Sequence, residues 1–147
     1  MEQLTILGKP FIPGLARGMA LVSAVPLSFW GGFDWKSGEI IDRRHPLSGE
    51  IAKGKVLAIP FTRGSSTTTA VLLEAIRAKT APVAILTTTT DFFFALASVV
   101  ADEMYSKSIP LVAITESDFS RLQSGDEVKV TESGTVIVTK ANNHVEA

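Results

Sequence analysis

A short apolar run, a polar loop and a helical pattern follow one another in residues 56–78, VLAIPFTRGSSTTTAVLLEAIRA. Residues 56–59 favour a buried strand, which Pro60 ends. Residues 70–78 carry apolar side chains at helical spacing, so we expect a helix with one apolar face. The same alternation continues along the chain and predicts strands at 55–59, 83–87 and 110–114, with helices at 67–79 and 91–105. This βαβαβ order implies parallel strands joined by right-handed crossovers.

Shorter strands are expected on both sides of this parallel core. The patterns predict strands at 4–7 and 18–25, a brief strand at 39–41, a short helix at 117–122 and a hairpin of 127–130 with 135–139. The first of these strands is expected to end at Gly8 and Pro10. Residues 28–50 are irregular and rich in Gly, Pro, Asp and His, as a working loop can be. The sequence therefore predicts an α/β fold, a single domain over residues 1–147 with a parallel βαβαβ core and β-rich ends.

The composition is that of a globular protein with one hydrophobic core. The chain has 147 residues, 46% of them hydrophobic and 20% charged, and a formal net charge of −1. Its Lys and Arg residues are scattered, so we expect no nucleic-acid partner. It has neither the roughly 18 consecutive apolar residues of a membrane span nor the start of a signal peptide, so we expect no membrane association and a cytoplasmic location. The absence of cysteine excludes disulfides, thiol catalysis and any cluster held by this chain's own thiolates.

The loop before the first predicted helix brings hydroxyls and backbone N–H groups to a helix N-terminus, where negative charge is favoured. Arg63 next to Gly64 and Ser65 can hold an anion there, or make the serine hydroxyl easier to deprotonate. Ser65 is therefore the first candidate for a chemical role. Simple N-capping by Ser and Thr explains the same pattern, and the spacing alone favours it. The GxxxxGK[ST] pattern of a P-loop is absent, so nucleotide binding is unsupported.

A second dense cluster occupies residues 26–34, PLSFWGGFD. The paired glycines Gly31 and Gly32 would let the backbone approach a ligand or partner closely. The aromatic residues beside them can equally fold the loop onto the core. Both interpretations stay open at this point, because one loop can serve a core and a site together.

Other polar residues are weaker candidates. His45 follows Asp42 by three residues, which allows an acid–base pair, although a loop histidine more often serves as a local hydrogen-bonding group. Thr87–Thr90 could line a site at the end of a strand, but threonines before Asp91 also suit a helix start, which we favour. No constellation of metal ligands is present. Nothing completes an active site, so either the protein is no enzyme or the rest of the site lies on another polypeptide.

Four motifs, taken together and in order, resemble a known family. They are residues 28–34 (SFWGGFD), 37–42 (SGEIID), 45–49 (HPLSG) and 63–66 (RGSS). This set is similar to the small subunit, or swivel domain, of aconitase X. The resemblance runs from Gly14 through the predicted strand at Ile109–Val112 and covers most of the chain.

The resemblance implies a swivelling β/β/α domain and a hydro-lyase activity. It implies a large aconitase X subunit as partner, with an iron–sulfur cluster on that subunit's cysteines and no metal on this chain. In the family a serine of the Gly–Ser motif removes a substrate proton, and the matching position is Ser65, while the cluster iron is the Lewis acid for the departing hydroxyl. Arg63 and the helix N-terminus would stabilise the serine alkoxide. The motifs further imply substrate-binding positions at Arg63, Gly64, Ser66, Ser28, Gly31 and Gly32, with Asp34 and His45 as additional candidates. Ser66 and Thr67 could equally cap the helix.

Two activities are associated with the family, the dehydration of cis-3-hydroxy-L-proline and the dehydration of phosphomevalonate, and each implies a different substrate. Archaeal small subunits of the phosphomevalonate type tend to lack a segment like Ala101–Tyr105, and Phe29–Trp30 looks more like bacterial members. The resemblance therefore favours the hydroxyproline type, with the phosphomevalonate small subunit as the alternative. Two other classes stay open: a non-catalytic module that binds a small anion, and a purely structural subunit.

Overall fold

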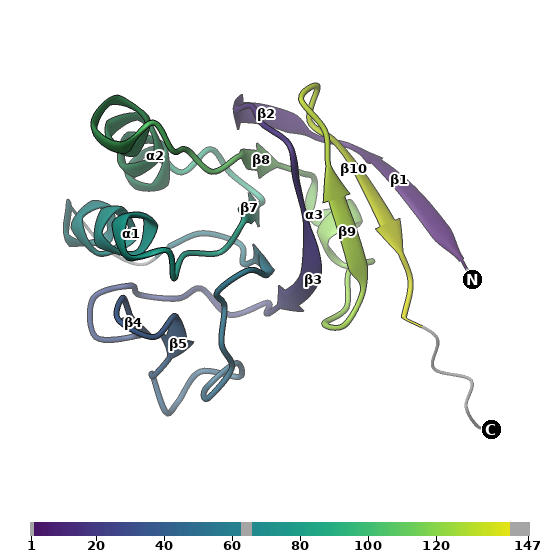
Figure 1. Cartoon of the computed structure of the whole chain (residues 1–147). Helices are drawn as coiled ribbons and strands as arrows, with labels where there is room; N and C mark the ends of the chain where they lie inside the picture. The colour runs from purple at the N-terminus through teal and green to yellow at the C-terminus, as the bar shows by residue number, and fades with distance from the viewer. Residues whose placement is uncertain (1, 63–65, 142–147) are drawn as a thin grey trace.

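The computed structural model of the chain describes residues 2–62 and 66–141, with the backbone alone at Ser66. Its elements are shown in Figure 1 and run in the order β1 (Gln3–Leu7), β2 (Lys9–Ile12), β3 (Ala16–Val22), β4 (Phe33–Asp34), β5 (Glu39–Ile40), β6 (Val56–Ala58), α1 (Ser66–Ala78), β7 (Ala84–Thr87), α2 (Phe92–Tyr105), β8 (Leu111–Ala113), α3 (Glu116–Phe119), β9 (Glu127–Val130) and β10 (Thr135–Thr139). None of the described helices is long and apolar enough to cross a membrane.

The centre of the fold is a parallel sheet covered by two helices. β3 pairs in parallel with β6, β6 with β7 and β7 with β8. The crossover helices α1 and α2 pack against each other on one side of this sheet (Figure 1). Successive strand residues point to opposite faces, so Leu57 and Ile85 join a core with Leu72 and Phe94 of the helices.

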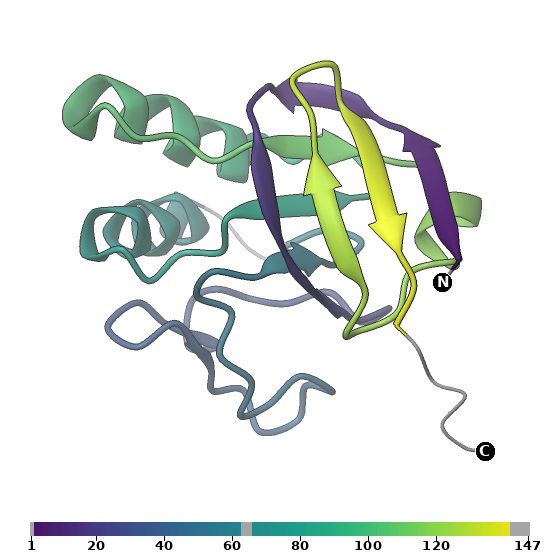
Figure 2. The ribbon, with the colours of Figure 1, turned by 45° about the vertical axis from the view of Figure 1, so that its right-hand side comes forward.

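The opposite face of the parallel sheet is covered by antiparallel strands. β9 pairs with β3, β10 with β9 and β1 with β10, so the full strand order is β1-β10-β9-β3-β6-β7-β8-β2. Figure 2 shows these strands lying in front of the parallel ones. Val56 and Leu86 of the parallel strands share a second buried core with Val128 and Val136 of the antiparallel ones. The layers are therefore β, β and α, which confirms the expected α/β fold with a parallel core and β-rich ends.

The two ends of the sheet order, β1 and β2, are consecutive strands joined only by Gly8. A Cβ at Gly8 would overlap Val112 Cγ1 and lie 2.8 Å from Gly134 O, so the tight passage between the two strands requires glycine. The expected end of the first strand at Gly8 is confirmed, whereas the sequence did not indicate that a second strand, β2, begins at Lys9 and contains Pro10. Pro10 lies in β2, opposite Val112, on an edge strand where the missing N–H interrupts no ladder.

The remaining boundaries shift by a few residues, as helix and strand ends commonly do. The strand predicted at 18–25 is Ala16–Val22, and after it Ser23 Oγ accepts a hydrogen bond from Val25 N at 2.9 Å, which turns the chain out of the sheet. The brief strand predicted at 39–41 pairs with a strand that the sequence did not indicate, Phe33–Asp34.

Asp126 holds the C-terminal end of β10 against the sheet. Its buried carboxylate accepts hydrogen bonds from Lys140 Nζ at 2.7 Å, Gln123 N at 2.9 Å and Ala141 N at 3.1 Å. Burial opposes ionisation of the carboxyl, but these bonds outweigh it and lower the pKa of Asp126. A carboxyl whose pKa is lower in the folded than in the unfolded chain stabilises the fold above its unfolded pKa, and this stabilisation is lost as the pH falls through the folded pKa.

We therefore expect acid to destabilise the fold partly through Asp126. Between about pH 5 and pH 2, the free energy of unfolding of the wild-type chain should fall more steeply than that of Asp126→Asn. At neutral pH the variant should be less stable, by on the order of 2 kcal/mol, because buried donors lose a charged acceptor. Urea unfolding at several pH values measures both slopes. Asp118→Asn, which removes a partly exposed carboxylate 3.2 Å from Arg121, is the control and should keep the wild-type slope. Equal slopes for wild type and Asp126→Asn would contradict the role given to Asp126.

Candidate functional site

Three loops leave the carboxyl ends of the parallel strands and meet at one edge of the sheet. In the described part of the chain they are residues 23–32 after β3, 59–62 after β6 and 88–91 after β7. Leu27 forms a parallel bridge with Thr62, and Thr88 N donates to Pro60 O at 3.0 Å, so the middle loop contacts both of the others. In open α/β sheets ligands bind at this edge.

Thr62 is fixed from several directions immediately before the RGSS motif. Its side chain is buried, and Oγ1 donates to Leu27 O at 3.1 Å and lies 3.3 Å from Thr68 Oγ1 in the first turn of α1. Its backbone N donates to Asp91 Oδ2 at 3.1 Å. The two predicted site residues that follow, Arg63 and Gly64, and the predicted base Ser65 lie outside the described residues. Ser66 begins α1, one residue before the predicted start of this helix at residue 67.

Asp91 is the N-cap of α2 and at the same time the partner of Thr62. Its Oδ1 accepts from Phe93 N and Phe94 N at 3.1 Å each, while its Oδ2 faces Thr62 N. The side chain is only 6% exposed, so these bonds are made away from water and are worth more than at the surface. One carboxylate therefore ties the start of α2 to the loop that leads into the RGSS motif. The sequence reveals an aspartate before a helix, but no local pattern reveals its second partner 29 residues away.

The threonines before Asp91 have structural partners. Thr87 Oγ1 donates to Thr89 O at 2.6 Å, and Thr88 Oγ1 donates to Pro60 O at 3.1 Å. The structural interpretation favoured from the sequence is confirmed for these two hydroxyls, although the residue that caps the helix is Asp91.

The aromatic residues of 26–34 divide between core and surface. Phe29 is fully buried, stacks on Phe33 with ring centroids 4.8 Å apart and meets Phe94 edge-on at 5.1 Å. Trp30, which lies between Phe29 and Phe33 in the sequence, is 69% exposed. The same loop therefore anchors itself in the core and presents one large aromatic side chain to solvent.

The two glycines of this loop have conformational reasons for being glycine. Gly31 has a φ of +77°, and a Cβ at Gly32 would overlap Ser28 O. Ser28 Oγ donates to Trp30 O at 3.1 Å across the same turn. These contacts account for the turn itself, and a substrate-binding role for the three residues stays a prediction.

His45 lies behind the first of the three loops. Its Nε2 donates to Val25 O at 3.0 Å and its Nδ1 accepts from Leu47 N at 3.1 Å, so both ring nitrogens are engaged by the backbone. Asp42 does not contact the ring, because its Oδ1 accepts from Arg44 N at 3.0 Å. This geometry favours the local hydrogen-bonding interpretation over the acid–base pair. A hollow of about 480 Å³ is bordered by both Ser28 and His45, which brings these two predicted residues together beside the candidate edge.

Asp34 lies elsewhere. Its carboxylate accepts from Lys36 N at 3.0 Å and from Ser37 Oγ at 2.9 Å, and these hydrogen bonds lower the pKa of Asp34. The neighbouring Trp35 O accepts from Thr80 Oγ1, just past the C-terminal end of α1. The residue after Asp34 thus contacts the C-terminal end of α1, whereas Thr62 contacts Thr68 in the first turn of that helix.

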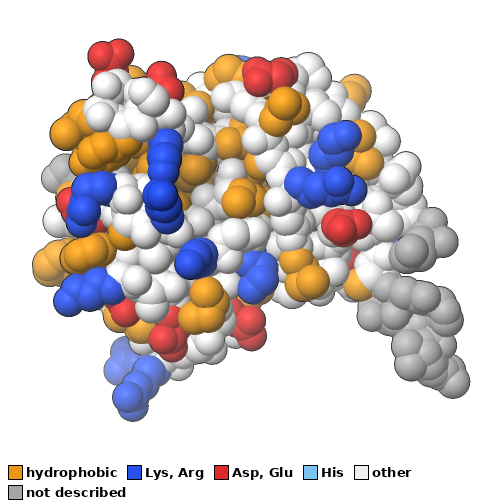
Figure 3. Space-filling view, in the orientation of Figure 1, with side chains coloured by type: hydrophobic (Ala, Val, Ile, Leu, Met, Phe, Trp, Pro, Cys, Tyr) orange, Lys and Arg blue, Asp and Glu red, His pale blue; other side chains and the backbone are white. Residues whose placement is uncertain are grey.

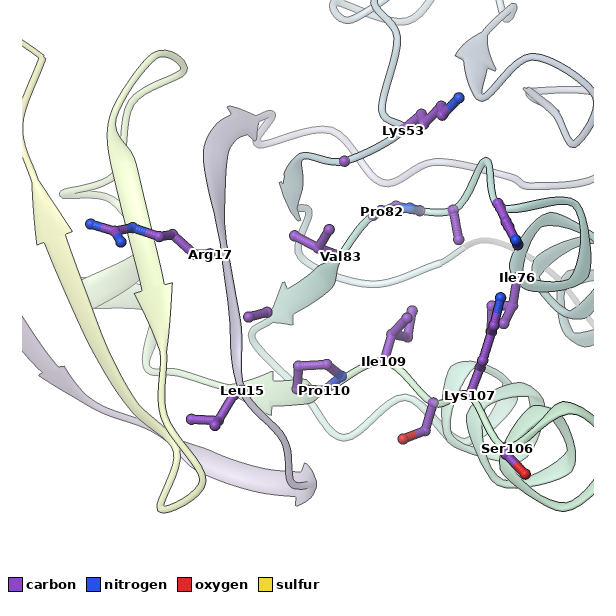
Figure 4. A pocket seen from close by; sticks show the side chains of 15 residues that line it. Leu15, Arg17, Lys53, Ile76, Pro82, Val83, Ser106, Lys107, Ile109 and Pro110 are labelled. Carbon is purple, nitrogen blue, oxygen red and sulfur yellow. The ribbon is translucent and has the colours of Figure 1, made fainter.

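A hollow of about 570 Å³ lies at the other edge of the parallel sheet (Figure 4). None of the predicted site residues lines it. Arg17, Lys53, Lys79 and Lys107 border it, but in Figure 4 the Arg17 side chain points away from Ile109 and Pro110. Lysines that follow helix C-termini complement the helix dipoles, which explains Lys79 and Lys107. Figure 3 shows Lys and Arg interspersed with Asp and Glu over the face it presents.

The described residues provide no cluster of metal-binding side chains. Within residues 2–62 and 66–141 no group of three His, Cys, Asp or Glu side chains could hold a metal ion. The full sequence has no cysteine. The residues of this chain therefore do not fit an iron–sulfur cluster.

In comparison with known proteins, the chain is similar to parts or subunits of proteins named dehydratases and to an aconitase X protein. It is 45% identical over 111 residues to a cis-3-hydroxy-L-proline dehydratase of Pseudomonas aeruginosa, a match that covers 76% of this chain and 19% of that protein. It is 34% identical over 134 residues to the phosphomevalonate dehydratase small subunit of Methanosarcina acetivorans, covering 90% of this chain and 89% of that protein. The chain thus spans about a fifth of the first relative and most of the second.

The fold gives the same answer. The structure matches a chain of the crystal structure of Thermococcus kodakaraensis aconitase X in its holo form with a TM-score of 0.82 and 29% identity, over 93% of this chain and 99% of that one. A family model described as the aconitase X swivel domain matches residues 5–139. The chain therefore belongs to the aconitase X swivel-domain family.

Proposed function

We propose that this chain is the swivel part of an aconitase X-type hydro-lyase and that it supplies the base, Ser65, which removes a proton from a small hydroxy acid. The observation that carries the proposal is the anchoring of Thr62 at the carboxyl edge of the sheet, immediately before Arg63, Gly64 and Ser65, in a chain of this family. A loop whose entry is held by a buried carboxylate suits a group that must meet its substrate in one orientation.

The chemistry of a dehydration divides into two parts. A base takes the proton from the carbon next to the one that bears the hydroxyl, and the electron pair of that C–H bond forms a double bond as the C–O bond breaks. The hydroxide that leaves takes up a proton, so that one proton and one hydroxide are lost in total as water. In the proposal Ser65 performs the first part, and Arg63 with the N-terminus of α1 stabilises the serine alkoxide. Gly64, Ser66, Ser28, Gly31 and Gly32 are proposed to contact substrate.

The second part requires groups that this chain does not have. Because it lacks cysteine, we propose that an iron–sulfur cluster belongs to a large partner subunit, as the "small subunit" names of the relatives imply such a partner. When bound there, the cluster would supply Lewis-acid chemistry.

The proposed substrate is cis-3-hydroxy-L-proline. The higher identity to the Pseudomonas protein, 45% against 34% for the Methanosarcina small subunit, supports this choice. The second candidate is 5-phosphomevalonate, which is favoured by the near-complete overlap with the Methanosarcina small subunit. Assays of the complex with the large subunit, prepared without oxygen, on both compounds decide between them.

Replacement of the proposed base is the first prediction for activity. In the complex with the large subunit, Ser65→Ala should lower turnover at least about 100-fold, the usual contribution of a positioned proton-transfer group, while substrate affinity falls much less. Ser117→Ala, which removes an exposed serine of α3, should leave both quantities unchanged. Near-normal turnover of Ser65→Ala would overturn the role of Ser65. If the wild-type complex binds the substrate without turning it over, and Ser65→Ala loses that binding, the alternative is favoured, a module that only binds a small anion.

Asp91 is predicted to be a positioning residue. In Asp91→Asn one carboxylate oxygen becomes an N–H donor, so either Thr62 N or the start of α2 loses its acceptor. We expect kcat to fall roughly 10-fold with KM little changed, because the loop before Ser65 is less well oriented. Asp102→Asn, an exposed position on the same helix, is the matched control. An unchanged kcat in a variant that still melts cooperatively would show that the bond between Asp91 and Thr62 does not orient the site.

A further inference from the structure

Three exposed aromatic side chains surround the candidate site. Trp30 is 69%, Phe61 44% and Phe92 74% exposed, and we refer to them together as the aromatic rim. Single exposed hydrophobic residues are ordinary on protein surfaces, but these three lie at one edge of the sheet: Trp30 and Phe61 are in the loops after β3 and β6, and Phe92 is the first residue of α2, directly after the loop that follows β7. Their common location therefore needs an explanation.

Contacts made by neighbouring residues place the three rim positions around the start of α2. Phe61 directly precedes Thr62 and Phe92 directly follows Asp91, and these two are joined by the bond from Thr62 N to Asp91 Oδ2. Trp30 follows Phe29, whose ring meets Phe94 in the first turn of α2 at 5.1 Å. All three rim residues are thus next in sequence to residues that contact one another around the N-terminus of α2.

An apolar stripe extends the rim along α2. Leu96 and Val99 follow Phe92 by four and seven positions, the spacing of one helix face, and they are 45% and 50% exposed. The opposite side of α2, with Phe94, Ala97 and Ala101, is buried in the core. Within the described residues, the helix therefore has a second apolar face that stays half exposed or more at Phe92 and Val99 and nearly half exposed at Leu96.

The proposed function, on which this inference rests, requires a second polypeptide at this edge. Ser65 can act only if the groups that accept the hydroxyl lie within reach of the same substrate molecule, and this chain has no residues for them among those described. Aromatic side chains are enriched at the buried centre of protein interfaces and carry a large share of their binding energy. We propose that the aromatic rim and the α2 stripe are the surface that the large subunit covers.

The test compares exposed hydrophobic residues at this edge with equally exposed ones elsewhere. Trp30→Asp and Phe92→Asp should each weaken binding of the purified chain to the large subunit at least about 10-fold, measured by titration calorimetry or biolayer interferometry. The controls are Leu15→Asp, at a side chain 69% exposed directly before β3, and Met19→Asp, at a side chain 53% exposed on β3. Both control variants should bind the large subunit like wild type. Circular dichroism and melting temperature confirm that each variant is folded.

The outcomes separate this inference from the proposed function, because association is measured without turnover. Weaker binding of the rim variants alone supports the rim as the large-subunit interface, even if the wild-type complex proves inactive on both substrates and the proposed function fails. Equal binding of all four variants, or an equal loss in the rim and β3 variants, overturns it. Concentration-dependent dimerisation of the isolated chain that Trp30→Asp abolishes, with normal binding to the large subunit, assigns the rim to a second copy and also overturns it.

Discussion

The arrangement of the candidate site depends on one buried carboxylate. Asp91 accepts hydrogen bonds from the first turn of α2 and from Thr62 N, so a single side chain fixes the start of a helix and the loop of a neighbouring strand. These two segments follow β7 and β6, which are neighbouring strands inside the sheet. The carboxyl ends of β6 and β7 cannot move apart without breaking the ladder between them. Thr62 adds a bond to Leu27 O, which brings the loop after β3 to the same place. Thr62, the residue directly before the RGSS motif, is therefore held in place, while the first three residues of the motif lie outside the described ones.

The carboxyl edge of the sheet is well held by these hydrogen bonds, but the candidate site at this edge lacks groups that a dehydration needs. The chain offers hydroxyls, glycines and an arginine in the motif but neither a cysteine nor a described cluster of metal ligands. Such a division of labour accounts for two forms of the relatives, one in which the matching region is about a fifth of a longer protein and one in which it is nearly a whole small subunit. In both forms, on this account, the same edge must face the groups that complete the reaction. This is why we propose the exposed aromatic residues of that edge as interface residues.

The sequence predicts the parallel core well because each of its strands is a short apolar run followed by a helical pattern, and both periods are local properties. It misses β2 because Pro10 usually interrupts a strand, and only the tertiary structure reveals that β2 lies at an edge. Within the candidate site, periodicity indicates a helix start near Ser66, but the bond between Thr62 and Asp91 joins residues whose proximity depends on the parallel pairing of β6 and β7. The same limit applies to His45 and Asp34. Their spacing from other polar residues does not reveal that backbone groups engage both ring nitrogens of His45. Nor does it reveal that the residue after Asp34 contacts the C-terminal end of α1. The roles of Ser65, Arg63 and Gly64 rest on the family resemblance and stay proposals.

The measurement that tests the central claim most directly is an experimental structure of the complex with the large subunit and L-proline, which lacks the hydroxyl that would leave. The account predicts that Ser65 Oγ lies within about 3.5 Å of the ring carbon that bears the carboxylate, the separation expected of reacting atoms. It also predicts that the aromatic rim is buried against the large subunit in the same structure. A Ser65 hydroxyl turned to the backbone N–H groups of α1 as a helix cap, with another side chain at that carbon, would contradict the assignment of Ser65 as the base.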